Sequence, residues 1–257
     1  MIEIRTIQKS EAPDFLRLLC EVFSLDFQRA SSVFFAEPLY DLNRKWAAFE
    51  DGVMQSILTT TALEFGWGAA IGIAGVATRP ERAGQGIGTQ LLERVLQASE
   101  DRGEGPALLF AHRESLYTRV GFETLDRVLR GSVAAEPEMT ELGEMSTIEI
   151  HERYREWAEG SPNRMRRNDA RWRFWSWGLR VCDRVGNGYL CLEGTTVREA
   201  VGQMPTDVWP VPKGTEWIGL SSLTEKIGVP LLASNADLYF MGRGFTEVPE
   251  MFLTDQF

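Results

Sequence analysis

A glycine-rich loop between a strand-like and a helix-like segment constrains this sequence more than any other feature. Residues 69–78 are mostly small or apolar, which predicts a buried strand. Helical periodicity resumes at Thr89 and ends near Gly103. Between them, glycine occupies every second position from Gly84 to Gly88, so the backbone there can approach a ligand closely. The sequence therefore predicts a strand, a loop and a helix that together present main-chain groups.

This loop is suited to phosphate groups, because the first N–H groups of a helix lack partners and the helix dipole favours an anion there. The spacing G-x-G-x-G differs from the dinucleotide-binding fingerprint, and the next strand carries no acidic residue suited to a ribose. The loop is not a P-loop, because no Lys-Ser or Lys-Thr pair follows Gly88. It indicates a pyrophosphate site of another kind or, alternatively, a turn without a ligand.

Strands and helices alternate through residues 1–133, which predicts an α/β arrangement around one sheet. The pair Asp51-Gly52 separates an apolar run from a β-branched run, which is typical of a hairpin. Ser10 is expected to cap the first helix. The expected strands are 1–7, 45–50, 53–65, 69–78, 107–111 and 124–133, and the expected helices are 11–23, 27–40, 89–103 and 114–120.

The rest of the sequence is expected to form a second unit. Residues 134–148 are rich in Glu and are interpreted as an acidic linker, which gives domains at 1–133 and 149–257. The segment Leu116–Glu123 is echoed by Leu238–Glu247 near the end of each half, as a tandem duplication would produce. A helix is expected near 149–158, with strands at 188–193, 196–202, 216–220, 229–234 and 247–253.

Residues 164–177 contain three tryptophans interleaved with arginines. Stacking and cation–π contacts would let such a segment bind a polyanion. A helix packed against a sheet explains the same composition, and the acidic linker offers partners for the arginines. Cys182 and Cys191 are interpreted as buried strand residues.

The composition narrows the classes of function. Three cysteines without a C-x-x-C pair and only two histidines argue against a disulfide framework and against a metal centre. The net charge of −10 disfavours a nucleic-acid partner. No apolar run reaches the roughly 18 residues of a membrane span, and the first residues do not read as a signal peptide. A cytoplasmic location without a membrane partner is therefore expected.

Two segments taken together resemble a known family. The first, Gly75–Leu92, reads GVATRPERAGQGIGTQLL, and the second, Leu116–Phe122, reads LYTRVGF. Both are similar to motifs of the GNAT superfamily of acetyl-CoA-dependent N-acetyltransferases. They look most like the branch of the enhanced intracellular survival (Eis) acetyltransferases. The resemblance implies a GNAT fold with a mixed central sheet, followed by a second, degenerate GNAT-like domain, without the sterol-carrier-like domain that this branch usually adds.

The resemblance also implies where acetyl-CoA binds. Backbone groups of Val76, Ala77 and Thr78 would hold the pantetheine arm, and His112 and Arg113 would lie along its far side. The pyrophosphate would lie on the amides of Gly84, Gln85, Gly86, Ile87, Gly88 and Thr89.

This sequence departs from the family pattern at one position of the loop. Ala83 stands where Arg or Gln is usual, and Arg82 lies one residue early. Either Arg82 supplies the missing charge or the phosphate site depends on amides alone. The loss of one charge-assisted contact would weaken coenzyme binding by about 1.5–3 kcal/mol.

Acetyl transfer requires a neutral amine, a donor for the oxyanion and stabilisation of the departing thiolate. By resemblance, Tyr117 faces the thioester sulfur, and a phenol that stays protonated can donate to the thiolate. A backbone N–H beside Val76 or Ala77 would serve the oxyanion. The predicted strand 69–78 contains no acidic residue, so the base remains open. The candidates are Glu64, His112 and, by resemblance, the chain-terminal carboxylate, here that of Phe257.

The sequence is therefore expected to encode an enzyme that moves an acetyl group from acetyl-CoA to a primary amine of a small molecule or peptide, with no metal. One alternative is a catalytically silent acyl-CoA-binding or regulatory protein. Another is a scaffold in which both halves serve an oligomer interface, and a homo-oligomer is compatible with each of these functions.

Overall fold

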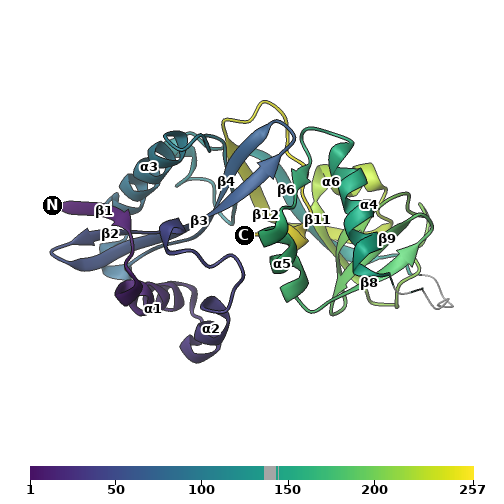
Figure 1. Ribbon diagram of the computed structural model, residues 1–257, viewed down its shortest axis with the longest axis horizontal. Helices are drawn as coiled ribbons and strands as arrows, with labels where there is room; N and C mark the ends of the chain where they lie inside the picture. The colour runs from purple at the N-terminus through teal and green to yellow at the C-terminus, as the bar shows by residue number, and fades with distance from the viewer. Residues whose placement is uncertain (136–142, 144) are drawn as a thin grey trace.

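Figure 1 shows a computed structural model in which one long mixed sheet runs through the molecule with helices packed along it. The structure describes residues 1–135, 143 and 145–257. The strands are β1 (Ile2–Thr6), β2 (Lys45–Glu50), β3 (Val53–Phe65), β4 (Gly68–Thr78), β5 (Ala107–Ala111), β6 (Glu123–Val133), β7 (Met165–Arg166), β8 (Arg180–Val185), β9 (Gly188–Glu193), β10 (Thr196–Val201), β11 (Glu216–Leu220) and β12 (Leu231–Arg243). The helices are α1 (Ala12–Phe23), α2 (Phe27–Phe34), α3 (Ile87–Glu100), α4 (Thr147–Glu159), α5 (Asp169–Trp177) and α6 (Ser221–Ile227).

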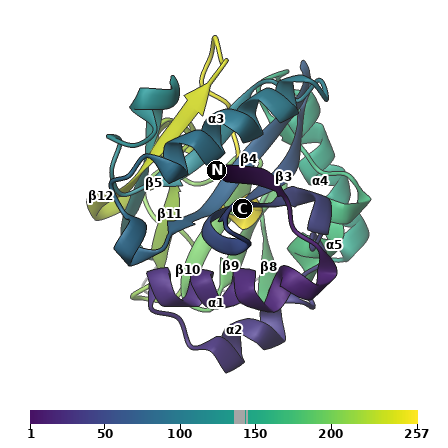
Figure 2. The same ribbon diagram turned by 90° about the vertical axis from the view of Figure 1, so that its left-hand side faces the viewer.

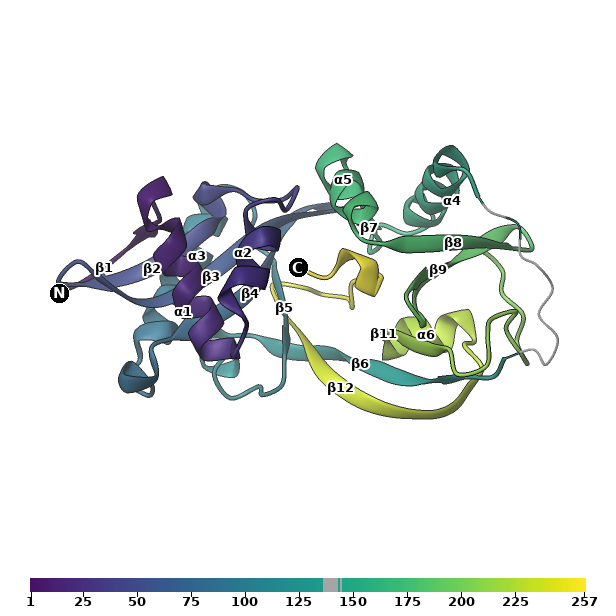
Figure 3. The same ribbon diagram turned by 90° about the horizontal axis from the view of Figure 1, so that it is seen from below.

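A strand from the C-terminal half lies inside the sheet of the N-terminal half. The strand order is β1-β2-β3-β4-β5-β12-β6-β11-β10-β9-β8, with β7 paired to β3. β12 runs antiparallel to β5 on one side and to β6 on the other. Figure 3 shows β6 and β12 running side by side from the middle of the molecule along its C-terminal half. The two halves thus share one hydrogen-bonded sheet, and their division into domains at 1–133 and 149–257 stays a prediction.

The predicted hairpin of β2 and β3 is confirmed. Glu50 pairs with Val53, and the two residues between them, Asp51 and Gly52, have φ values of 51° and 77°. A tight turn with two positive φ values matches the right-handed twist of the strands that it joins. The predicted strands 69–78, 107–111 and 124–133 also form, as β4, β5 and β6.

Helices cover both faces of the N-terminal strands. Figure 2 shows α3 on one side of β1–β4 and α1 with α2 on the other. Alternation along β2 explains this arrangement, because Trp46 and Ala48 pack with α3 while Ala47 and Phe49 pack with α1. Each face thereby buries its own apolar cluster.

Helix boundaries differ from the sequence prediction at several places. Ser10 does not cap the first helix, because it lies within a 3₁₀ turn that Gln8 and Glu11 close as a capping box. α2 ends at Phe34, earlier than expected. α3 begins at Ile87 instead of Thr89, because the left-handed conformation of Gly86 (φ 80°) already ends the loop.

The last third of the chain also differs from the prediction. The strand expected at 229–234 extends as β12 to Arg243, because its continuation pairs with both β5 and β6. The strand expected at 247–253 is wrong: a single bridge at Glu250 leads into the 3₁₀ turn Leu253–Asp255. β8 was not predicted, although Cys182 and Cys191 are buried on β8 and β9 as expected.

The sequence echo between the two halves does not correspond to equal local structure. Leu116–Phe122 forms a turn with a 3₁₀ segment at Thr118–Val120, which ends at the positive φ of Gly121. The echoing residues 238–243 lie instead within β12, because both edges of this segment are paired. The echo therefore gives no structural support for a duplication.

Some expectations concern features that the described residues only partly reveal. Most of the predicted linker 134–148 lies outside the described residues. Among the helices of the described chain, none is long and apolar enough to cross a membrane. Within the same residues, no three His, Cys, Asp or Glu side chains gather in a way that would hold a metal ion.

Candidate active site

β4 and β5 diverge in the middle of the sheet. They pair in parallel only from Ile71 to Ile73, although β4 continues to Thr78. At Gly75, with φ of +60°, the register of β4 against β3 shifts by one residue, which marks a bulge. Among the described residues, no strand pairs with the β5 side of β4 beyond Ile73. On this side of β4, the main-chain groups of Val76–Thr78 that do not pair with β3 are therefore left for a ligand.

The N-terminus of α3 lies against the end of β4. A side-chain carbon placed on Gly88 would stand 3.1 Å from Thr78 Oγ1, so glycine permits this close approach. Gly84 and Gly86 have φ values of +77° and +80°. No side chain caps α3, and its first turn holds no acidic residue. The predicted pantetheine and phosphate residues are thus brought together, and the first turn of α3 adds no carboxylate that would compete for its free N–H groups.

Arg82 is engaged within the loop region. Its guanidinium pairs with the carboxylate of Glu50, and its Nε donates to Gln85 Oε1 at 2.9 Å. The hydrogen bond between Arg82 and Glu50 raises the pKa of the guanidinium and lowers the pKa of the carboxyl. Both partners of this pair are partly exposed, so its contribution to stability is small. Arg82 must therefore break its pair with Glu50 before its guanidinium can contact a phosphate in place of the side chain that Ala83 does not provide.

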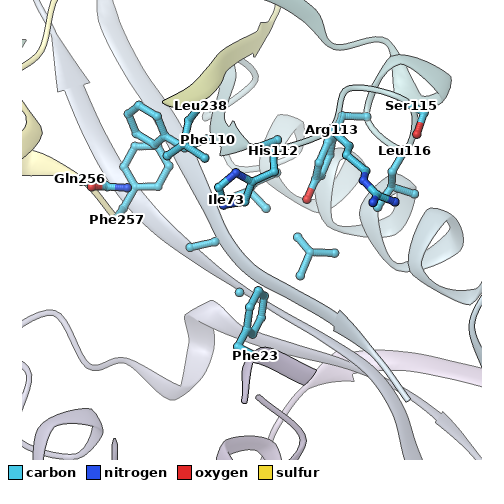
Figure 4. Close-up of a pocket in the computed structure, with 15 residues that line it drawn as sticks. Phe23, Ile73, Phe110, His112, Arg113, Ser115, Leu116, Leu238, Gln256 and Phe257 are labelled. Atoms are coloured by element: carbon cyan, nitrogen blue, oxygen red, sulfur yellow. The ribbon is translucent and has the colours of Figure 1, made fainter. Parts of the chain in front are cut away.

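A cavity of about 540 Å³ opens beside the free edge of β4 (Figure 4). It brings together several residues predicted from the sequence, from β4, from the end of β5, from the following turn and from the C-terminal segment. These residues are Val76, His112, Arg113, Tyr117 and Phe257.

Tyr117 is held at the entry to a short turn. Its main-chain N–H donates to Glu114 O at 2.9 Å, and its carbonyl accepts from Val120 N at 3.0 Å. The ring packs edge-on against Phe122, with 6.2 Å between ring centroids. Burial raises the pKa of the Tyr117 phenol. The hydroxyl is therefore protonated at neutral pH and can act as a hydrogen-bond donor.

Two of the three candidate bases lie at the cavity. His112 follows β5 and points into the cavity (Figure 4). The ring of Phe257 covers Gly72, where an added side-chain carbon would stand 2.4 Å from Phe257 Cγ. Glu64 lies elsewhere: it pairs with Arg166 in the sheet and lines a different cavity.

A buried ionic cluster anchors the segment that carries Phe257. The Arg167 side chain is fully buried and contacts Glu199 Oε2 at 2.5 Å and Asp255 Oδ2 at 2.7 Å. Arg167 also lies 3.7 Å over the ring of Tyr154. Arg171 donates to the carbonyl of Asp255 and to that of Ala62 in β3, each at 3.2 Å. This cluster fixes the last residues between the N-terminal half and the C-terminal half of the molecule, where Figures 1 and 3 place the C-terminus.

The same cluster predicts loss of stability in acid. Burial alone would raise the pKa of Glu199, but the charge of Arg167 and hydrogen bonds from Arg167, Thr254 and Tyr189 outweigh it, so this pKa lies below its ordinary value. The stabilisation is therefore present above the unfolded-state pKa and is lost as the pH falls through the folded-state pKa. Urea unfolding from pH 7 to pH 3 should show a steeper loss of unfolding free energy in the unaltered protein than in Glu199→Gln. Equal slopes would contradict this assignment.

The tryptophan- and arginine-rich segment forms a packed helix. Trp175 on α5 is buried and donates to Glu199 at 3.1 Å. Arg164 and Arg167 pair with Glu250, Glu199 and Asp255. These arginines are thus engaged within the fold, which favours the packing interpretation of the segment over polyanion binding.

Several cavity residues were missed by the sequence analysis, among them three with large apolar side chains. Phe23 ends α1, Phe110 lies on β5 and Leu238 lies on β12. The apolar run at 107–111 signals a strand, but which face is open to a ligand depends on how far β5 separates from β4. Leu238 reaches the cavity only because β12 inserts beside β5, and no local pattern indicates this.

Comparison with known proteins relates this chain to acetyltransferases. Residues 3–125 match a family model described as the acetyltransferase (GNAT) domain. The crystal structure of a GCN5-related N-acetyltransferase from Kribbella flavida has a TM-score of 0.70 at 14% identity, covering 94% of this chain and 70% of that chain. The fold is the GNAT fold.

Further solved structures share this GNAT fold. A putative acetyltransferase from Pyrococcus horikoshii has a TM-score of 0.66 at 14% identity, covering 98% of this chain and 92% of that chain. Eis1 from Mycobacterium abscessus has a TM-score of 0.61 at 16% identity, covering 93% and 73%. No curated protein matches the sequence.

Proposed function

We propose that this protein is an N-acetyltransferase that moves an acetyl group from acetyl-CoA to a primary amine. The observation that carries the proposal is the junction of the free edge of β4 with the uncapped N-terminus of α3, beside a cavity that Tyr117 lines. An extended amide arm needs main-chain partners, and a pyrophosphate needs N–H donors at a helix N-terminus. The GNAT domain match over residues 3–125 supports the same function.

Each part of the site has a role in this proposal. Bound acetyl-CoA would supply the acetyl group as a thioester. Main-chain groups of Val76–Thr78 bind the amide arm, and the N–H groups from Gly84 to Thr89 hold the pyrophosphate. A main-chain N–H at Val76 or Ala77 donates to the oxyanion, while Tyr117 donates to the departing sulfur. Arg113 lies along the far side of the arm.

The acceptor amine must lose a proton before it attacks. An alkyl amine has a pKa of about 10.4 and is charged at neutral pH. His112 and Phe257, whose α-carboxylate is the other candidate, both line the cavity. We propose that one of them takes this proton, because Glu64 lies at another cavity.

The remaining half of the chain is proposed to complete the acceptor site. In this proposal residues 149–257 form a degenerate GNAT-like unit joined through 134–148. Its contribution is Leu238 on β12 and the segment that ends at Phe257, both of which line the cavity.

Release of CoA thiol from acetyl-CoA, followed with a panel of primary amines, tests the proposed function. Amine-dependent release with formation of the N-acetylated amine is expected. Binding of acetyl-CoA without release would favour the silent acyl-CoA-binding protein, for which Ala83 and the engaged Arg82 are the supporting observations.

Replacing Tyr117 by Phe is expected to lower kcat by about 100-fold, because the departing thiolate loses its donor. The KM for acetyl-CoA should change little, since the phenol does not contact the phosphates in this arrangement. Tyr40→Phe is the matched control, because Tyr40 packs against Phe34 and Lys45 outside the cavity. Steady-state kinetics with both substrates measures kcat and the two KM values separately. An unaltered kcat would remove Tyr117 from the mechanism.

A further inference from the structure

The cavity has two ends of different character. Arg113, Ser115 and Leu116 lie at one end in Figure 4, and Phe110, Leu238 and Phe257 gather at the other, with His112 between them. The first end belongs to the turn that carries Tyr117. In the proposed function it takes the thioester, which leaves the second end for the acceptor.

Aromatic rings form the wall of the second end. Phe110 stacks on Phe240 with ring centroids 5.0 Å apart, and Phe257 lies 5.6 Å from Phe110 at an angle of 45°. Phe23 on α1 lies apart from these rings, across the cavity from His112 (Figure 4), and is about half exposed, at 48%. Such a wall suits an apolar or aromatic group, because offset and edge-on ring contacts add to the burial of apolar area.

The charges of the cavity exclude a polycation. Its lining, as far as the structure describes it, contains no Asp or Glu side chain. Arg113 is its one permanently charged side chain there, and Gln256 adds a neutral amide. Among the described lining residues, no side-chain carboxylate compensates an ammonium group. A second ammonium would lie near Arg113 or among the rings without a partner, which is costly.

Resting on the proposed function, we infer that the acceptor is a monoamine that carries one aromatic group, an arylalkylamine in chemical class. Its ring lies among Phe110, Leu238 and Phe257, and its amine points towards His112. Polyamines and aminoglycosides, which carry several ammonium groups, are poor acceptors for this cavity.

Kinetics with four amines tests the inference: 2-phenylethylamine, 3-methylbutylamine, spermidine and kanamycin. The kcat/KM for 2-phenylethylamine should exceed that for spermidine by about 30-fold or more, since a buried phenyl group alone contributes a factor of this size. Equal or better use of spermidine or kanamycin would overturn the inference and leave the proposed function intact.

A pair of variants tests the charge argument separately. Leu238→Glu places a carboxylate in the second end, and Leu238→Gln has the same shape without the charge. The ratio of kcat/KM for spermidine over 2-phenylethylamine should rise about tenfold in Leu238→Glu relative to Leu238→Gln. No difference between the two variants would contradict the placement of the acceptor.

Binding distinguishes failure of the inference from failure of the proposed function. If neither these four amines nor the wider amine panel is acetylated, the proposed function fails. The inference then depends on thermal unfolding in the presence of each amine and CoA. A rise in Tm with 2-phenylethylamine that spermidine does not produce supports it. No rise with 2-phenylethylamine overturns it.

Discussion

Replacing Gly86 by Glu should abolish stabilisation of the protein by acetyl-CoA. The added carboxylate stands at the N-terminus of α3, where the pyrophosphate is proposed to bind. Two like charges about 4 Å apart near a protein surface repel by about 4 kcal/mol, which weakens binding about 1000-fold. Thermal unfolding with and without acetyl-CoA measures the effect. In the unaltered protein, ligand at 100 times its Kd adds about 2.7 kcal/mol of stability.

Gly86→Gln is the matched control for this prediction. Gly86 has φ of +80°, so any side chain there is strained, and both variants share that cost. The space around Gly86 is open, with no heavy atom within 4 Å of an added side-chain carbon. Gln should therefore retain a rise in Tm with acetyl-CoA that Glu loses. A rise in the Glu variant equal to that of Gln would place the phosphates elsewhere.

Arg167→Met is expected to lower the free energy of unfolding by about 3–5 kcal/mol. The variant leaves the carboxylates of Glu199 and Asp255 buried without their common partner, and removal of one partner from a buried ion pair carries a cost of this size. Urea unfolding measures the change. Because Asp255 precedes the cavity residues Gln256 and Phe257, KM for the amine should also rise in variants that remain folded.

Two further variants separate charge from packing in this cluster. Arg153→Met removes an exposed pair with Glu156 on α4 and should change the unfolding free energy by less than about 0.5 kcal/mol. The combination of Arg167→Met with Glu199→Gln and Asp255→Asn leaves no buried charge and should regain part of the lost stability. A loss below 1 kcal/mol in Arg167→Met alone would contradict the anchoring role.

Local sequence patterns predicted the part of the site that is built from consecutive residues. The order of β4, the glycine loop and α3 follows from apolar periodicity and from glycine at positions that need positive φ. The hairpin of β2 and β3 was predicted for the same reason, since Asp51-Gly52 encodes its own turn. These features depend on neighbours in the chain, and the structure confirms them as elements of the fold.

The end of the cavity that is proposed to take the acceptor lay beyond such patterns. Leu238 reaches it because β12 pairs with β5 across more than 120 residues of sequence, and Phe257 does so because Arg167 holds Asp255. The buried partners of Arg167 lie 32 and 88 residues away in sequence, so the arginine-rich segment has no local signal that separates packing from ligand binding. Long-range pairing of this kind follows from the fold as a whole.

Calorimetric titration of the unaltered protein with acetyl-CoA tests the central claim most directly, because the claim is that β4 and the N-terminus of α3 form a coenzyme site. We expect saturable binding with one acetyl-CoA per chain, and no heat of binding with the same titration of Gly86→Glu. An absence of binding to the unaltered protein would contradict the claim, and the interpretation of both halves as a scaffold would then be preferred.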